Sequence, residues 1–207
     1  MGYKKITALL AASALLLSGC SGLSAKRDQV YTDTLFDTVV NIRIYDAADE
    51  SVLKGCEELC KKYDAMFSRT NENSEISMIN NAGGAAVEVS KETIKLIQKG
   101  IYYSEMSDGA FDITIGSVSA LWDFKSDAPA VPDAAAIADA VSHVNYENIL
   151  IRDNTVRLLD PQAKLDVGAI AKGYIADRVR DYLEEEGIDH AMIDLGGNIV
   201  AMGSKPD

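Results

Sequence analysis

The stretch Leu165-Asp-Val-Gly-Ala-Ile-Ala-Lys-Gly-Tyr-Ile-Ala-Asp177 predicts the local structure around which the rest of the chain is arranged. Its first residues read as the end of a strand, Gly168 favours a tight turn, and a helix is expected from Ala169 onward. The first turn of a helix carries unpaired N–H groups and the positive end of the helix dipole. The turn is therefore a candidate seat for a phosphate or diphosphate group. The alternative is an ordinary helix start that binds nothing.

Two charged side chains flank this turn. Asp166 precedes it, and Lys172 lies within the first two turns of the expected helix. An acid and a base therefore stand on either side of the candidate anion site. If the site binds a ligand, the bend from Asp166 into Ala169 has to open on a cleft rather than lie sealed in the core.

The N-terminal segment predicts export and attachment to a membrane. A basic start precedes a short apolar run, too short for a stable membrane span, which ends in Leu-Ser-Gly-Cys at residues 17–20. This ending resembles the lipobox of bacterial lipoproteins and implies lipidation of the Cys20 thiol. Residues 1–19 are then a lipoprotein signal peptide, and residues 20–30 are the lipidated cysteine and its tether. The expected location is the extracytoplasmic face of the cell membrane; an ordinary secretory signal is the alternative.

The charge of the chain limits its partners. The 207 residues carry a formal net charge of −12, with 47% hydrophobic residues, an ordinary share for a globular protein. Such an acidic surface repels nucleic acid and anionic lipid, so we expect no nucleic-acid partner, and membrane attachment depends on the lipid anchor. An anionic substrate needs a local cation or a helix N-terminus.

Two further cysteines, Cys56 and Cys60, lie one helical turn apart on the same face of an expected helix. Side chains from successive turns have poor geometry for a disulfide. Binding of a metal ion by the pair is possible, but no further cysteine or nearby histidine completes a ligand set. We therefore expect both side chains to pack in the core.

The hydrophobic pattern predicts an α+β fold with mostly antiparallel strands. Helices are expected after the capping residues Asp49, Ser74 and Ser90, before Val141, and from Ala169 to about Glu186. Strands are expected at 40–44, 163–167, 191–195 and 199–202, a hairpin at 149–159, and an extended segment at 110–116. This order lacks the regular strand–helix alternation of a doubly wound sheet.

Four stretches, in this order and spacing, resemble the ApbE family of FAD:protein FMN transferases. They are 67–77 (Phe-Ser-Arg-Thr-Asn-Glu-Asn-Ser-Glu-Ile-Ser), 108–116 (Asp-Gly-Ala-Phe-Asp-Ile-Thr-Ile-Gly) with 121–124 (Leu-Trp-Asp-Phe), 165–174, and 194–198 (Asp-Leu-Gly-Gly-Asn). Each stretch alone is a weak signal. Together they extend the resemblance over residues 31–207, which are then the N-terminal portion of an FAD-binding domain.

The resemblance implies a two-lobed fold related to the T-fold, and an enzyme that binds FAD and Mg²⁺. Such enzymes move FMN from FAD to a threonine hydroxyl of an acceptor protein and release AMP. Typical acceptors are subunits of electron-transfer or ion-pumping oxidoreductases. The alternatives are an FAD pyrophosphatase and a non-catalytic or truncated flavin-binding lipoprotein.

The resemblance also assigns roles to individual residues. The main-chain carbonyl of Ala169 matches a magnesium ligand, and a backbone oxygen is a donor that magnesium accepts. The residues that match FAD contacts are Phe36, Ala110, Phe111, Asp112, Asp166 and Lys172. From the residues alone, a core aromatic is the favoured interpretation of Phe111, and Asp112 could equally be a turn cap.

This sequence departs from the family pattern in two places. Many members carry a tyrosine that stacks on FAD where this chain has Thr70. The chain also ends at Asp207, whereas the family pattern continues well beyond the corresponding position. The catalytic residues and the side-chain magnesium ligands are therefore expected outside these 207 residues, which alone are expected to bind FAD poorly and to be inactive.

Overall fold

The computed structural model describes residues 28–122, 128 and 130–205. The expected signal peptide, Cys20 and most of its tether lie outside the described residues, as do residues 123–124 of the second family motif.

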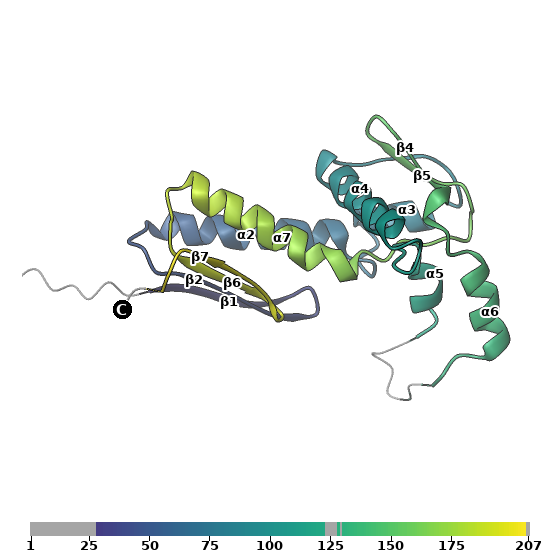
Figure 1. Ribbon diagram of the computed structural model, residues 1–207, viewed down its shortest axis with the longest axis horizontal. Helices are drawn as coiled ribbons and strands as arrows, with labels where there is room; N and C mark the ends of the chain where they lie inside the picture. The colour runs from purple at the N-terminus through teal and green to yellow at the C-terminus, as the bar shows by residue number, and fades with distance from the viewer. Residues whose placement is uncertain (1–27, 123–127, 129, 206–207) are drawn as a thin grey trace, which may run out of the picture.

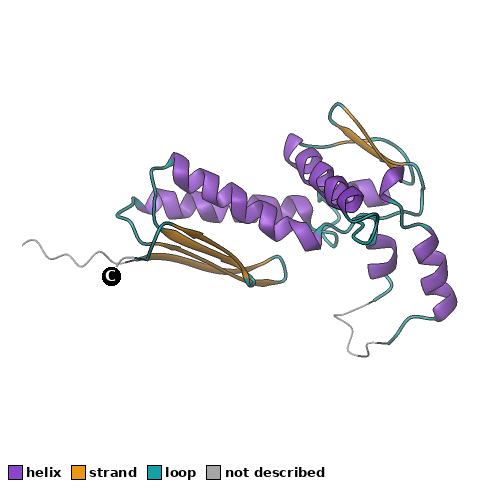
Figure 2. Ribbon diagram, viewed as in Figure 1, coloured by secondary structure: helices purple, strands orange, loops and turns teal. Residues whose placement is uncertain are grey.

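One lobe is a four-stranded antiparallel sheet with two long helices on one face (Figure 1 and Figure 2). Its strands, in the spatial order β1-β2-β6-β7, are β1 (Gln29–Leu35), β2 (Thr38–Ile44), β6 (Ala191–Leu195) and β7 (Asn198–Met202). The helices are α2 (Glu50–Phe67) and α7 (Gly168–Glu185). Alternation in β2 explains the sidedness, because Val40, Ile42 and Ile44 are fully buried while Val39 is 59% exposed.

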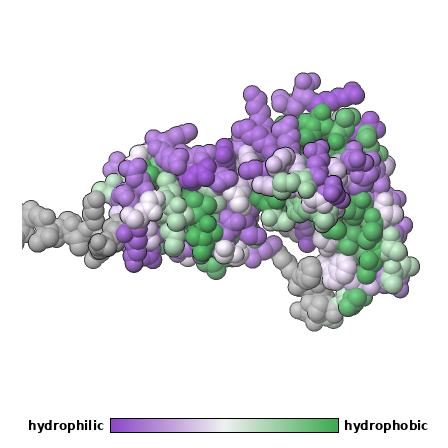
Figure 3. Space-filling model, in the orientation of Figure 1, coloured by the Kyte–Doolittle hydropathy of each residue, from purple (hydrophilic) through white to green (hydrophobic). Residues whose placement is uncertain are grey.

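The second lobe is built mainly from helices. They are α3 (Glu75–Asn81), α4 (Lys91–Met106), α5 (Gly116–Ser119), α6 (Ala134–Ser142) and the 3₁₀ turn η1 (Tyr146–Asn148). A small antiparallel sheet, ordered β3-β5-β4, completes it with β3 (Val87–Glu88), β4 (Ile149–Arg152) and β5 (Thr155–Leu158). Figure 3 shows a hydrophilic surface over the tip of β4 and β5 and a more hydrophobic one over α6. The predicted α+β class with antiparallel sheets is confirmed.

Glu92, in the first turn of α4, joins the two lobes. Its Oε2 accepts hydrogen bonds from the Tyr174 hydroxyl of α7 at 2.6 Å and from the Tyr63 hydroxyl of α2 at 3.3 Å. The Tyr63 and Phe67 rings stack at 5.4 Å, and both meet the edge of Tyr174. Burial, and then the charge of Glu92, raise the pKa of Tyr63 to about 12. Tyr63 therefore stays a hydrogen-bond donor at neutral pH.

The helix boundaries follow the capping residues. The Ser74 hydroxyl accepts from the Ser77 N–H, and the Ser90 hydroxyl accepts from the Thr93 N–H. Asp49 occupies the expected N-cap position of α2, but its side chain makes no capping hydrogen bond. Among the described helices, none is long and apolar enough to cross a membrane.

The expected strand at 163–167 is wrong, although the alternation that predicted it is real. Ala163, Leu165 and Val167 are all buried, yet only Lys164 forms a bridge, to Ile115. The backbone of Leu165 pairs instead with a side chain: the Asn80 amide accepts from its N–H at 2.6 Å and donates to its carbonyl at 2.9 Å. The Asn80 side chain of α3 thus makes the two backbone hydrogen bonds that a neighbouring strand would otherwise make.

Further differences concern the segment 110–116 and strands that the sequence pattern did not indicate. The 110–116 segment is a series of turns that leads into α5 rather than an extended run. Strands β1 and β3 were not expected.

The prediction for the cysteines is confirmed: Cys56 and Cys60 are free and buried, and burial raises the pKa of each thiol to about 12.

Candidate functional site

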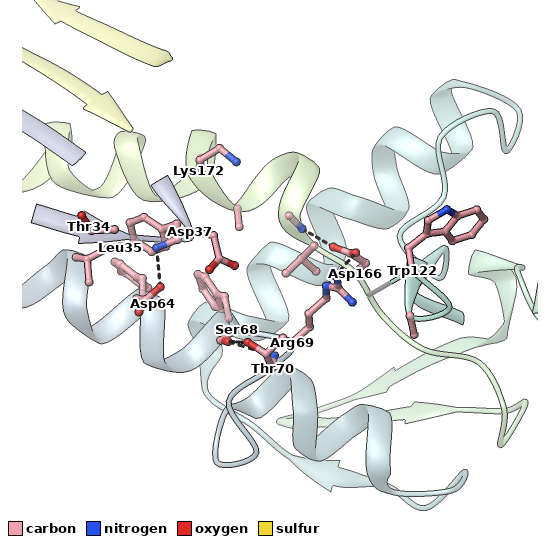
Figure 4. Close-up of a pocket in the computed structure, with 17 residues that line it drawn as sticks. Thr34, Leu35, Asp37, Asp64, Ser68, Arg69, Thr70, Trp122, Asp166 and Lys172 are labelled. Carbon is pink, nitrogen blue, oxygen red and sulfur yellow. Dashed lines mark hydrogen bonds and ion pairs between the residues drawn. The ribbon is translucent and has the colours of Figure 1, made fainter. Parts of the chain in front are cut away.

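A cleft of about 870 Å³ lies beside the N-terminus of α7 (Figure 4). This volume is within the range of small-molecule and cofactor sites. Four segments form its walls: the β1–β2 turn, the C-terminal end of α2 with the loop after it, the end of α5, and the start of α7. The lining residues are Thr34, Leu35, Phe36, Asp37, Tyr63, Asp64, Phe67, Ser68, Arg69, Thr70, Ala120, Trp122, Asp166, Val167, Gly168, Ala171 and Lys172.

The bend into α7 lies at the surface, which is the condition that a ligand site at this turn has to meet. Leu165 and Val167 anchor it in the core, whereas Gly168 and Ala169 are exposed. The Gly168 N–H donates to Asp166 Oδ1 at 3.0 Å. Among the described residues, no acceptor is recorded for the next N–H, that of Ala169. The helix start therefore offers a free donor and its dipole to a ligand.

Asp166 is held in place by several elements at once. Its Oδ2 accepts from the Ser119 hydroxyl at 2.8 Å and lies 3.6 Å from Arg69 Nε. Its backbone N–H donates to the Ile113 carbonyl at 2.8 Å. The carboxylate is thus oriented toward the cleft while its side chain keeps 21% exposure.

Gly116 allows this close approach. It packs so tightly on the 164–165 backbone that an added Cβ would lie 2.7 Å from the Leu165 carbonyl oxygen and closer still to that of Lys164. Real Cβ atoms are not found at such distances from backbone atoms. The second and third family motifs therefore meet where only glycine fits.

The β1–β2 turn brings backbone strain to the opposite wall. Phe36 and Asp37 both have φ of 56°. This left-handed conformation is rare for a bulky side chain and is typical of the two central residues of a type I′ hairpin turn. The Phe36 N–H donates to Asp64 Oδ1 at 2.9 Å, which ties the turn to α2. Strained residues of this kind cluster at ligand sites.

The structure brings three of the predicted site residues together. Phe36, Asp166 and Lys172 all line the cleft. Ala169 lies between Gly168 and Ala171, which line the cleft, but it is not itself among the lining residues. Its role as a metal ligand stays a prediction.

The other three predicted residues lie outside the cleft lining. Asp112 fastens its own loop: Oδ1 accepts from the Thr114 N–H and hydroxyl, both at 2.7 Å, and Oδ2 accepts from the Tyr146 N–H at 2.8 Å. Phe111 meets the Tyr103 ring edge-on at 6.4 Å. Ala110 starts this loop. Contacts between these three residues and FAD stay predictions; the contacts present correspond to the core-aromatic and turn-cap alternatives.

Reasoning from the sequence missed several cleft residues. Arg69 and Trp122 were inside quoted motifs but received no role. Asp37 and Asp64 carried no signal in the sequence, because their place beside the cleft depends on the β1–β2 pairing.

The described residues contain no group of three or more His, Cys, Asp or Glu side chains that could hold a metal ion. Mg²⁺ in proteins is commonly bound by one or two carboxylates, with the remaining positions taken by substrate phosphates and water. An ion held mainly by a substrate needs few protein ligands, so the described residues are compatible with a site of this kind, in which the Ala169 carbonyl is the predicted protein ligand.

Comparisons with known proteins identify the family of the chain. A model of the ApbE family matches residues 36–207. The FAD:protein FMN transferase of Klebsiella pneumoniae (strain 342) is 35% identical over 184 residues, which cover 87% of this chain and 58% of that protein. The one from Treponema pallidum (strain Nichols) is 29% identical over 201 residues, covering 91% of this chain and 56% of that protein.

Solved structures give the same result. The ApbE protein of Thermotoga maritima has a TM-score of 0.79 at 31% identity, covering 86% of this chain and 60% of the other. The flavin transferase ApbE from Vibrio cholerae has a TM-score of 0.79 at 25% identity, with coverage of 86% and 60%. This chain thus spans less than two thirds of the length of each of these relatives. The match covers all four motifs and the whole described fold apart from its first residues, and the chain belongs to the ApbE family.

Proposed function

We propose that the protein binds FAD in the cleft beside α7 and, as a full-length enzyme, transfers FMN from FAD to a threonine hydroxyl of an acceptor protein, with Mg²⁺ and with release of AMP. Family membership and the names of the relatives, FAD:protein FMN transferases, support flavin transfer. The observation that carries the proposal is the meeting of Asp166, Lys172 and the exposed start of α7 at one cleft.

The residues of this chain bind and orient the substrate. The free N–H and the dipole at the start of α7 favour a phosphate oxygen, and Lys172, one turn further, adds a positive charge. The ring of Phe36 lines the cleft and offers apolar surface to an aromatic ring of the dinucleotide. Holding the diphosphate against a rigid helix end fixes the phosphorus for attack.

The transfer itself exchanges a phosphoanhydride bond of FAD for a phosphoester bond to threonine. A bond forms between the threonine oxygen and the phosphorus of the FMN half, and the bond from that phosphorus to the bridging oxygen breaks. AMP leaves with the bridging oxygen, and the threonine proton passes to a base that we do not assign among the described residues. When bound through the Ala169 carbonyl, Mg²⁺ would neutralise the charge that develops on the phosphate oxygens.

We also propose that the protein works at the extracytoplasmic face of the cell membrane, anchored through a lipid on Cys20. Its acceptor is then a flavin-bearing subunit of an electron-transfer or ion-pumping oxidoreductase exposed on that side. Replacing Cys20 with serine should release the protein from the membrane fraction into the soluble fraction. Retention of the Cys20→Ser protein in the membrane would argue against the lipid anchor.

The activity is tested by incubating the full-length protein with FAD, Mg²⁺ and a candidate acceptor that carries the target threonine. Covalent flavin is read as fluorescence of the acceptor band on a denaturing gel, and AMP is measured in parallel. Lys172→Gln should lower the rate, while Lys54→Gln, an exposed lysine on α2, is the matched control. Release of AMP and free FMN without labelled acceptor would favour an FAD pyrophosphatase. Binding of FAD without AMP would favour a non-catalytic flavin-binding protein.

A further inference from the structure

We propose that Arg69 is a phosphate-binding residue of the cleft, and that it gives the site its preference for phosphorylated flavins over riboflavin. The inference rests on the proposed function and adds a residue to it. Arg69 lines the cleft from the loop after α2, facing the start of α7 (Figure 4). It carries one of the two positive charges among the described lining residues; the other is Lys172.

The pairing between Arg69 and Asp166 leaves the guanidinium free to bind a ligand. The distance of 3.6 Å from Arg69 Nε to Asp166 Oδ2 is too long for a hydrogen bond, so the contact is a loose ion pair. Asp166 is already hydrogen-bonded by Ser119 and by the Gly168 N–H. Arg69 makes no other ion pair or side-chain hydrogen bond with a described residue, and its side chain is 35% exposed. Its five N–H donors match the geometry of phosphate oxygens.

The loop holds Arg69 at a fixed position before any ligand arrives. The Ser68 hydroxyl accepts from the N–H groups of Thr70 at 3.2 Å and Asn71 at 3.1 Å. The Ser68 carbonyl accepts from the hydroxyls of Ser74 and of Ser77 in α3. Because the backbone on both sides of Arg69 is fastened, little loop entropy is lost when its side chain binds an anion.

The charge balance of the cleft makes this arginine important. Among the described residues that line it, three are carboxylates (Asp37, Asp64 and Asp166) and two are cations, a sum of −1 for these five side chains in a chain of net charge −12. Removing the positive charge of Arg69 lowers the summed charge of these lining side chains to −2 and leaves the Asp166 carboxylate without its ion-pair partner. A diphosphate then meets greater repulsion, whereas an uncharged flavin meets none.

The test is a titration of the full-length protein with FAD, FMN and riboflavin, followed by flavin fluorescence. Arg69→Gln should weaken binding of FAD and of FMN about tenfold or more, the usual effect of losing one charge-assisted contact, and should change riboflavin binding by less than about twofold. Arg69→Lys should recover part of the affinity for FAD. Arg152→Gln, an exposed arginine on β4 outside the cleft lining, is the matched control and should bind all three ligands as the wild type does.

Equal weakening for all three flavins, or a lowered melting temperature that accounts for the loss, would show that Arg69 only supports the fold and would overturn the inference. Unchanged binding of FAD by Arg69→Gln would overturn it as well, while leaving the proposed function intact. If the wild-type protein binds none of the three flavins, the proposed function fails together with the inference.

Discussion

Replacing Gly116 with alanine should destabilise the protein and displace Asp166, because the added methyl group has no room. The new Cβ would lie 2.7 Å from the carbonyl carbon and oxygen of Leu165, and closer to the Lys164 oxygen. These are backbone atoms and cannot rotate away, so the 113–116 and 164–166 segments have to separate. Ser119 would then lose its 2.8 Å contact with Asp166.

The expected cost is about 3 kcal/mol, the upper end of the range for overpacking a closely packed site. For a protein of this size, that corresponds to a fall of roughly 6–12 °C in melting temperature. Urea unfolding, followed by circular dichroism, measures the free energy directly. Affinity for FAD should fall as well, since the carboxylate and the start of α7 are no longer held together.

Gly173→Ala is the matched control. Gly173 lies inside α7, and its added Cβ would meet only Asn198 Nδ2, at an ordinary 3.6 Å. The same substitution should therefore raise stability by up to about 1 kcal/mol, the helix propensity gained over glycine. If Gly116→Ala is as stable as the wild type, or if both variants change stability in the same direction, the proposed contact between the two motif segments is refuted.

Three further substitutions test other parts of the structure. Burial alone would raise the pKa of Glu92, but hydrogen bonds from Lys95 and Tyr174 outweigh it and hold the pKa below its ordinary value. The stability that Glu92 provides should therefore be present above about pH 4.5 and be lost as the pH falls through the lowered pKa. In acid titrations of unfolding, the difference in stability between wild type and Glu92→Gln should shrink below that pH, and a difference independent of pH would contradict this. Asp112→Ala should cost about 2 kcal/mol in urea unfolding, because it leaves loop N–H groups without an acceptor; a loss of FAD binding without a loss of stability would instead indicate a direct ligand contact. Thr70→Tyr should tighten the binding of FAD and of riboflavin by up to about tenfold by adding a stacking ring, and unchanged affinity would show that another side chain already fills that position.

The sequence predicted most of the fold because its signals are local. Ser74 and Ser90 cap their helices, the alternation around Ile42 marks a half-buried strand, and Gly187 follows the end of α7. The expected strand at 163–167 failed because its partner is the Asn80 side chain, 85 residues away, and no local pattern reveals such pairing.

The candidate site could be predicted only where a motif marked it. Asp166 and Lys172 were found through the glycine turn. Asp64 could not be found, because it reaches the cleft only when α2 packs against the β1–β2 turn and binds the Phe36 N–H. The place of such a residue in the cleft depends on how distant elements pack together, and the local pattern of a single sequence does not predict that packing.

The central claim is that the diphosphate of FAD binds at the start of α7, between Lys172 and Arg69. The most direct test is a crystal structure of the full-length protein with FAD and Mg²⁺. We predict phosphate oxygens within hydrogen-bonding distance of the Ala169 N–H and of a cation from Lys172 or Arg69. FAD bound elsewhere, or with its diphosphate turned away from this helix end, would contradict the account.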